Sequence, residues 1–230
     1  MVSEDDSAMR LAHARAALAS VHQKVGVERV SDEAPALPLA DALGTLLTQG
    51  LRRGQVVSVE GATSLMLALG AAASAQGSWT AIVGLPRVGV VAAARRGIEL
   101  SRLALMPHPG VQAAQVVGAC VDGMDVVMLG PRLALSHADR RRLASRARER
   151  GSVLIVAEQW EGANVSLTVE SSHWRGLGSG DGRLREREMT VVVGGRSRGS
   201  GRRVNVTLDV DPGVAWARPG ARAVIDEEVA

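Results

Sequence analysis

The sequence predicts an α/β fold: a mainly parallel sheet flanked by helices, with an antiparallel hairpin at the C-terminal end of the core. Segments 126–129 and 153–157 are apolar without alternation, which is typical of strands buried on both faces of a sheet. Strand-like and helical segments alternate between residues 39 and 159, which indicates strand–helix–strand units. After residue 165 two strand-like segments surround a basic turn, which predicts the hairpin.

The predicted elements are short and are separated by glycine, proline or helix caps. Ser136 and Asp139 have the spacing of a capping box, and Gly151 follows the helix that they begin. A glycine-rich break is expected over residues 176–182. The expected helices are 40–47, 64–75, 88–96, 111–121 and 136–150, and the expected strands are 56–59, 80–83, 103–106, 126–129, 153–157, 165–170, 187–193 and 204–210.

Three parts are expected along the chain: an N-terminal helix and linker over 1–37, a core over 38–212 and a tail over 213–230. Ser3 and Asp6 cap a predicted helix over 4–23, whose narrow apolar stripe would pack either on its own domain or on a neighbouring subunit. The tail has little periodicity, and we expect it to be poorly ordered by itself.

Composition narrows the class of protein. The 230 residues include four Trp and no Phe or Tyr, which argues against a nucleic-acid surface built on stacked aromatic rings. Net charge is +3 and almost all basic residues are Arg, which favours pairing with phosphate or carboxylate groups. A single cysteine, Cys120, and five scattered His leave no disulfide or zinc pattern. Without a signal sequence or a membrane-spanning segment, a cytoplasmic protein is expected.

Residues 55–72 have the outline of a phosphate-binding loop from which the loop itself is missing. A strand-like segment leads to Gly61, and the helical segment begins at Thr63 and Ser64. A phosphate-binding loop needs four residues between its glycines and a Lys before the Ser or Thr. The only lysine in the chain is Lys24, before this strand, so Gly61, Thr63 and Ser64 are interpreted as a degenerate remnant.

Four segments carry a resemblance to a known family: residues 38–44 with 50–57, residues 63–69, residues 95–103, and residues 174–178 with 182–184. The first segment enters the first strand, the second is the helix after the shortened loop, the third leads from a helix to a strand, and the fourth lies late in the core. In this order they resemble the RecA core, and most closely the RecA-like accessory proteins of bacterial mutagenic translesion synthesis, the ImuA and ImuA-prime type.

Departures from the RecA pattern all concern nucleotide chemistry. Besides the lost lysine, the second strand ends in Val83-Gly84 where RecA-like ATPases have a catalytic carboxylate, and the fourth runs from Leu129 into Gly130 where they have a metal-binding Asp. Gln159 lies near the place where such enzymes sense the terminal phosphate. Because phosphoryl transfer depends on these groups, we expect no enzymatic activity and no cofactor.

The resemblance implies a noncatalytic adaptor in a DNA-damage-inducible mutasome. Its partners would be an inactive Y-family polymerase-like protein and, through it, an error-prone C-family polymerase and the sliding clamp. DNA is a further candidate partner, and no membrane is expected. One alternative is a SulA-like inhibitor of cell division that binds the tubulin-like division protein, and another is an ATPase with an unrecognised site.

Arginines dominate the end of the core. Between residues 175 and 203 there are eight Arg against Asp181, Glu186 and Glu188, a net charge of +8 − 3 = +5. The segment is either a nonspecific DNA-binding surface or a simple flexible hairpin, since Arg-Gly-Ser loops serve both purposes. The candidate DNA-binding residues are Arg175, Arg183, Arg185, Arg187, Arg196, Arg198, Arg202 and Arg203.

Candidate partner-binding residues are Trp174 and Trp216, together with Arg142, Arg146 and Arg150 on one predicted helix. Trp is a frequent interface anchor. Trp160 also lies outside the regular core pattern, whereas Trp79 is expected to pack in the core. The arginine stripe is either a solvated helix face or a docking face for acidic protein or DNA.

Overall fold

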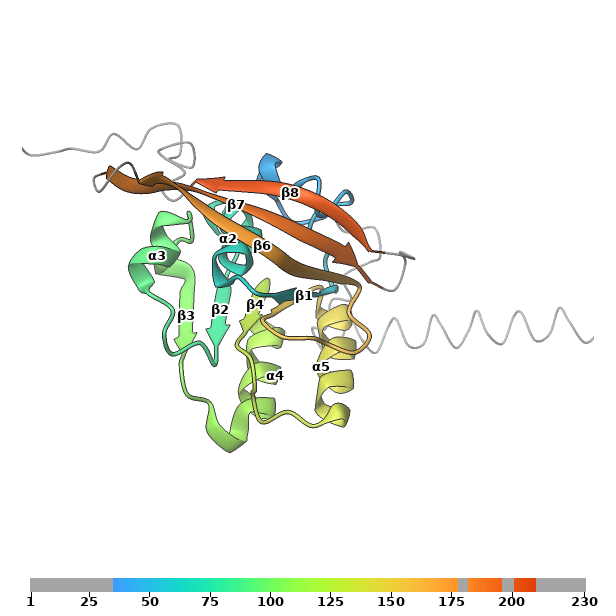
Figure 1. Cartoon of the computed structure of the whole chain (residues 1–230). Coiled ribbons are helices and arrows are strands. Elements are labelled where there is room, and N and C mark those ends of the chain that lie inside the picture. Colours follow the sequence, from blue (N-terminus) through green and yellow to red (C-terminus); the bar gives the residue numbers. More distant parts are fainter. Residues whose placement is uncertain (1–34, 178–181, 196–200, 210–230) are drawn as a thin grey trace, which may run out of the picture.

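The computed structural model describes residues 35–177, 182–195 and 201–209, so the predicted helix over 4–23 and the tail lie outside the described residues. Eight strands form one sheet in the order β3-β2-β4-β5-β1-β6-β7-β8 (Figure 1). The strands are β1 (Val56–Glu60), β2 (Thr80–Val83), β3 (Leu103–Met106), β4 (Val126–Leu129), β5 (Val153–Val156), β6 (Val165–Leu177), β7 (Gly182–Gly194) and β8 (Arg202–Asp209).

The strands from β3 to β6 are all parallel, and β7 and β8 are added antiparallel at the β6 edge. This confirms the predicted α/β class and the C-terminal antiparallel hairpin. The helices are α2 (Thr63–Ala75), α3 (Val90–Arg95), α4 (Ala113–Gly123) and α5 (His137–Arg150), with short 3-10 turns η1 (Asp41–Leu43), η2 (Leu100–Arg102) and η3 (Gly110–Gln112).

Helices cover both faces of the parallel strands. One core packs α4 and α5 against alternate side chains of β2, β4 and β5, and Trp160 is buried in it. The other core contains α2, the segment around η1 and the inward side chains of the parallel strands, and it also includes β7 and β8. The described part of the chain contains no helix that is long and apolar enough to cross a bilayer.

Helix α2 is buried around its whole circumference. Its ten residues from Leu65 to Ser74 are all inaccessible to solvent or nearly so. The parallel strands supply one wall, and Val191, Val206 and Leu208 of β7 and β8 belong to the same apolar cluster. This environment explains why the helix is apolar without an amphipathic stripe.

Helix α5 has the predicted caps. The Ser136 hydroxyl accepts from the Asp139 backbone N–H at 3.1 Å, and the Asp139 carboxylate accepts from the Ser136 N–H at 3.0 Å. Gly151 ends the helix with φ +68°, in the left-handed region that glycine tolerates best. The capping box and the glycine stop are therefore confirmed.

Several predicted boundaries were wrong. The expected helix over 40–47 is only the turn η1, and β6 and β7 extend to Leu177 and from Gly182 into the predicted glycine-rich break. Gly176, at φ +112°, lies at a shift in register between Arg175 and Leu177, so this glycine makes a bulge inside the paired strands instead of ending them. A bulge and a turn use the same residue type, which misled the sequence interpretation.

Two glycines at the carboxyl ends of β4 and β2 are in direct contact. A Cβ atom added to Gly130 would lie 1.9 Å from the Gly84 carbonyl oxygen. We expect Gly130→Ala to lower the free energy of unfolding by about 2–3 kcal/mol or more, since the backbone of two strands must separate. Gly123→Ala is the control, because nothing lies within 4 Å of its added Cβ. Urea denaturation should show no loss of stability for the control, and equal stability of the two variants would contradict the prediction.

Candidate binding pocket at the carboxyl edge of the sheet

The turn between β1 and α2 is tightly closed. Gly61 has φ +93°, and a Cβ atom at this position would lie 3.1 Å from Val169 Cβ on β6. Ala62 is the N-cap of α2 and provides no side-chain hydrogen bond. The turn therefore packs directly on the neighbouring strand and does not rise above the sheet as a phosphate-binding loop does.

Arg187 of β7 reaches the first turn of α2. Its Nη1 donates to the Ser64 hydroxyl at 2.7 Å, and its Nε donates to the Ser172 hydroxyl at 2.7 Å. The guanidinium also lies over the Trp174 ring, 5.0 Å from the ring centroid. Burial lowers the pKa of Arg187 from its ordinary value. The partially positive end of a helix disfavours a cation, so these hydroxyl and ring contacts offset an unfavourable position.

A cavity of about 1300 Å³ opens beside this turn, at the carboxyl ends of the parallel strands. In open α/β sheets this edge is the usual place for ligands. Gly61, Thr63 and Ser64 line the cavity together with Trp174, so the structure brings these predicted residues to one site. Among the described residues that line it there is no Asp, Glu or Lys; the lining is mostly apolar, with arginines Arg87, Arg95, Arg96 and Arg132.

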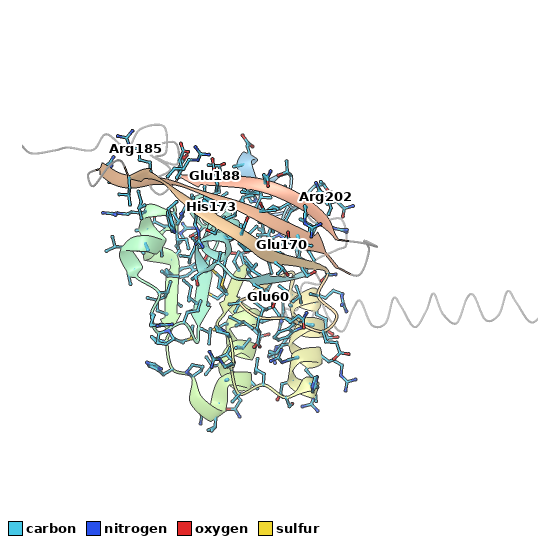
Figure 2. All side chains as sticks on the ribbon, viewed as in Figure 1. Glu60, Glu170, His173, Arg185, Glu188 and Arg202 are labelled. Atoms are coloured by element: carbon cyan, nitrogen blue, oxygen red, sulfur yellow. The ribbon has the colours of Figure 1, made fainter. Side chains whose placement is uncertain are left out.

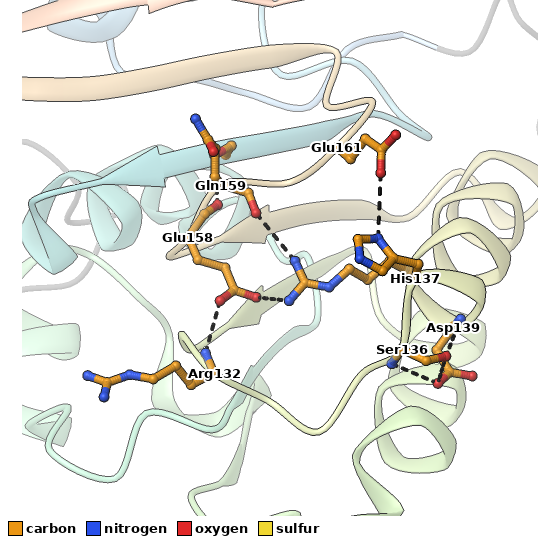
Figure 3. A network of polar contacts seen from close by, with 9 residues as sticks. Arg132, Ser136, His137, Asp139, Glu158, Gln159 and Glu161 are labelled. Atoms are coloured by element: carbon orange, nitrogen blue, oxygen red, sulfur yellow. Dashed lines mark hydrogen bonds and ion pairs between the residues drawn. The ribbon is translucent and has the colours of Figure 1, made fainter.

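The loop after β4 is held in place by Glu158 (Figure 3). Its carboxylate accepts from the Arg132 backbone N–H at 3.0 Å and from Arg140 Nη2 at 2.6 Å. The Arg140 guanidinium lies over the ring of Trp160, 5.0 Å from its centroid. Arg132 itself has φ +60°, an unusual conformation for a residue with a side chain. The backbone at the cavity wall is thus positioned by an ion-pair network, while the Arg132 side chain is exposed.

Gln159 does not line this cavity. Its backbone carbonyl accepts from Arg140 Nη1 at 3.3 Å, as part of the same network (Figure 3). The described lining residues offer no carboxylate for general acid–base work or for metal coordination; besides the four arginines, they include one histidine, His108. Such an arrangement can bind apolar or anionic groups, and it supplies no pair of catalytic acids and bases.

Most of the described candidate DNA-binding arginines have partners within the protein. Arg175 pairs with Glu188 at 2.6 Å, and Arg203 makes two 2.8 Å contacts with the Glu170 carboxylate. Arg202 donates to the Thr45 carbonyl, and Arg187 is held as described above. Figure 2 labels Glu170 on β6 and Glu188 on β7, the strands next to or carrying these arginines. Only Arg183 and Arg185, among the described members of this set, make no such contact; Arg196 and Arg198 lie outside the described residues.

The arginine stripe on α5 packs partly against α4. Arg146 Nε donates to Asp122 at 2.7 Å and Arg150 Nε donates to the same carboxylate at 3.1 Å, while Arg142 remains exposed. The hydrogen bond from Arg146 lowers the pKa of Asp122 below its ordinary value. Two of the three predicted docking arginines therefore join two helices.

The tryptophans differ from the prediction in two cases. Trp79 is 47% exposed, because it precedes β2 at the amino end of the sheet, so the expectation that it packs in the core was wrong. Trp160 is 4% exposed and belongs to the core of α4 and α5. Trp174 is 47% exposed, and Trp216 lies outside the described residues.

Sequence reasoning missed several residues that line the cavity. Val111 is 92% exposed and Val91 is 65% exposed, although both lie in segments predicted to be helices. Arg132 gave no signal either, since the carboxylate that accepts from its backbone N–H belongs to Glu158, in a later part of the chain. One signal was available: Pro86, Pro107 and Pro131 each follow a predicted strand, which marks the loops at one edge of a parallel sheet.

The fold and this pocket define an α/β protein with a mixed sheet and an arginine-lined, mainly apolar pocket at the carboxyl edge of its parallel strands. The chain belongs to the family described as MT3502 N-terminal domain, whose model matches residues 44–162. That match includes β1 to β5 and every pocket-lining residue except Trp174. The uncharacterized protein Rv3395c of Mycobacterium tuberculosis is 35% identical over 169 residues, covering 72% of this chain and 78% of that protein.

The Asp122 contacts predict a pH-dependent contribution to stability. Since the folded protein lowers the pKa of Asp122, the contribution is present above the ordinary carboxyl pKa of about 4 and is lost as the pH falls through the lowered value. Asp122→Asn should reduce the free energy of unfolding at pH 7 by at most about 1 kcal/mol, because the pair is partly exposed. Urea titrations should show this difference vanish towards pH 2.

Asp41→Asn is the matched control for this prediction, since the Asp41 side chain is exposed and makes no ion pair with any described residue. A stability difference for Asp122→Asn that is constant from pH 7 to pH 2 would show that the ion pair contributes nothing.

Proposed function

We propose that this protein is a noncatalytic adaptor with a RecA-like core that supports error-prone translesion synthesis in a DNA-damage-inducible mutasome. The observation that carries the proposal is the chemistry of the carboxyl edge. The described residues that line its pocket include no Asp, Glu or Lys, and Gly130, where RecA-like ATPases have a metal-binding Asp, has no room for a side chain. Nucleotide turnover depends on those groups.

The resemblance to the ImuA type supports the proposal through its segments. The shortened loop, the first turn of the helix from Thr63, and Arg95 and Arg96 at the start of the passage over 95–103 line the pocket. Membership of the MT3502 N-terminal domain family assigns no activity, so the assignment to a mutasome rests on the resemblance alone.

A protein partner fits the end of the long β6–β7 hairpin. Trp174, Leu177 and Leu184, which we call the hairpin end, are 47%, 65% and 38% exposed. Exposed large apolar side chains on neighbouring strands are typical of interaction surfaces. Two of the nearby arginines, Arg175 and Arg187, are paired within the protein, and the exposed apolar side chains suit a protein better than a DNA backbone. Direct DNA contact would depend on Arg183 and Arg185, which have no internal partner among the described residues.

A noncatalytic protein should neither bind nor hydrolyse nucleotides. Purified protein should show no magnesium-dependent ATP hydrolysis above buffer, and its Tm should not change with millimolar ATP, since binding to the folded state would raise it. Gly130→Asp should not restore activity, because the side chain would clash with the Gly84 carbonyl. Hydrolysis that is lost on replacing Arg132, or a Tm shift that depends on ATP concentration, would contradict the noncatalytic assignment.

A mutasome adaptor should be needed for damage-induced mutagenesis. Deleting the gene should lower damage-induced mutation frequency, and Trp174→Ala should reduce both mutagenesis and capture of the inactive Y-family polymerase-like partner by about tenfold, the usual effect of losing an interface anchor. Trp79→Ala is the matched control, because Trp79 is equally exposed at 47% but lies at the opposite end of the sheet. Equal effects of both variants would remove the hairpin end from the proposal.

Overexpression in undamaged cells distinguishes the alternative. Filamentation without damage, together with unchanged mutagenesis in the deletion strain, would favour a SulA-like inhibitor of the tubulin-like division protein. Normal division with reduced mutagenesis supports the adaptor.

A further inference from the structure

The pocket at the carboxyl edge combines an apolar floor with unpaired positive charge. Leu85, Val88 and Leu133 line it beside the exposed Val91 and Val111. Arg87, Arg95 and Arg132 also line it, are exposed, and make no ion pair with any described residue. A ligand that placed apolar groups on the floor and carboxylates next to them would match both properties.

A segment with this combination of apolar and acidic side chains follows β8, which ends close to the pocket. Strand β8 ends at Asp209, whose carbonyl oxygen accepts a hydrogen bond from Arg96 Nη1. Arg96 itself lines the pocket. The chain therefore leaves the sheet within the length of one arginine side chain of the cavity wall, and an extended chain covers about 20 Å in six or seven residues.

The sequence after Asp209 lies outside the described residues, but its chemistry is known. It contains Val224-Ile225 followed at once by Asp226-Glu227-Glu228, two apolar side chains adjoining three carboxylates. We propose that residues 222–229 bind in this pocket in cis, with Val224 and Ile225 on the apolar floor and the three carboxylates paired with Arg95 and Arg132. This inference goes beyond the adaptor function and does not depend on it.

Binding in cis is favoured because the linker keeps the acidic segment at a high effective concentration near the pocket. Sixteen residues separate Asp209 from Asp226, and linkers of this length give effective concentrations of roughly millimolar. Such a contact needs little affinity to be populated, so a few exposed ion pairs and two buried aliphatic side chains are sufficient. Occupation would also place the acidic segment where an anionic ligand would otherwise bind.

Photo-crosslinking of the full-length chain tests the proposal. A benzophenone amino acid in place of Val224 should crosslink to peptides containing residues 85–92, 107–111 or 131–134, as mapped by mass spectrometry. The same probe in place of Trp79, at the amino end of the sheet, should give none of these products. Crosslinks spread over the whole chain, or directed to α4 and α5, would overturn the proposal.

Charge variants test the ion pairs. Combining Arg95→Glu with Arg132→Glu should reduce the yield of pocket crosslinks by about fivefold, the effect of losing two exposed ion pairs. Arg141→Glu with Arg142→Glu, on exposed positions of α5, is the matched control and should change nothing. Replacing Asp226, Glu227 and Glu228 with Lys in the variant that carries Arg95→Glu and Arg132→Glu should restore the crosslink yield. Reduction without rescue would overturn the charge pairing, and circular dichroism checks that each variant is folded.

Two further crosslinking experiments distinguish this segment from other possible ligands of the pocket. When ¹⁵N-labelled and unlabelled chains are mixed, crosslinks within one chain support the proposal, whereas mixed products show that a second copy supplies the segment and overturn binding in cis. Millimolar magnesium-ATP should leave the yield unchanged. Loss of the crosslinks with ATP would show that the pocket binds a polyphosphate instead of the acidic segment.

Discussion

The burial of α2 on all sides is the constraint on which the structure depends. Met66 and Leu69 are fully buried, and a Cβ atom on Gly70 would reach Met128 of β4, so the helix lies very close to the parallel strands. Its other side needs an apolar cover as well, which β7 and β8 supply through Val191 and Val206. Burying one aliphatic side chain contributes about 1.5–3 kcal/mol, so these two strands are part of the core and not an appendage.

This cover also shapes the site. Because β7 must cross α2, it carries Arg187 to the first turn of the helix, where Ser64 accepts its hydrogen bond. A cation at a helix N-terminus is unfavourable by itself, and the Trp174 ring and the Ser172 hydroxyl offset that cost. The turn from Gly61 to Ser64 is therefore bound to the C-terminal hairpin, and its residues contribute to packing.

Features that depend on residues close together in the sequence were predicted correctly. The apolar runs 126–129 and 153–156, the Ser136 cap and the Gly151 stop are all confirmed, because each depends on residues within a few positions. Contacts between residues far apart in the sequence could not be predicted. Arg187 and Ser64 are 123 residues apart, and the partners of Arg146 and Arg203 belong to other elements, so an arginine stripe looked like a free surface.

The contact between Gly84 and Gly130 connects the fold to the proposed function. By the resemblance, each glycine stands where RecA-like ATPases have a carboxylate, and the ends of β2 and β4 lie so close that a Cβ atom on Gly130 would be 1.9 Å from the Gly84 carbonyl oxygen. A carboxylate at position 130 would require the two strands to separate, so the backbone itself opposes a metal-binding side chain there. The described residues that line the pocket at this edge are mainly arginines and aliphatic side chains, which fits the proposed adaptor that carries out no phosphoryl transfer.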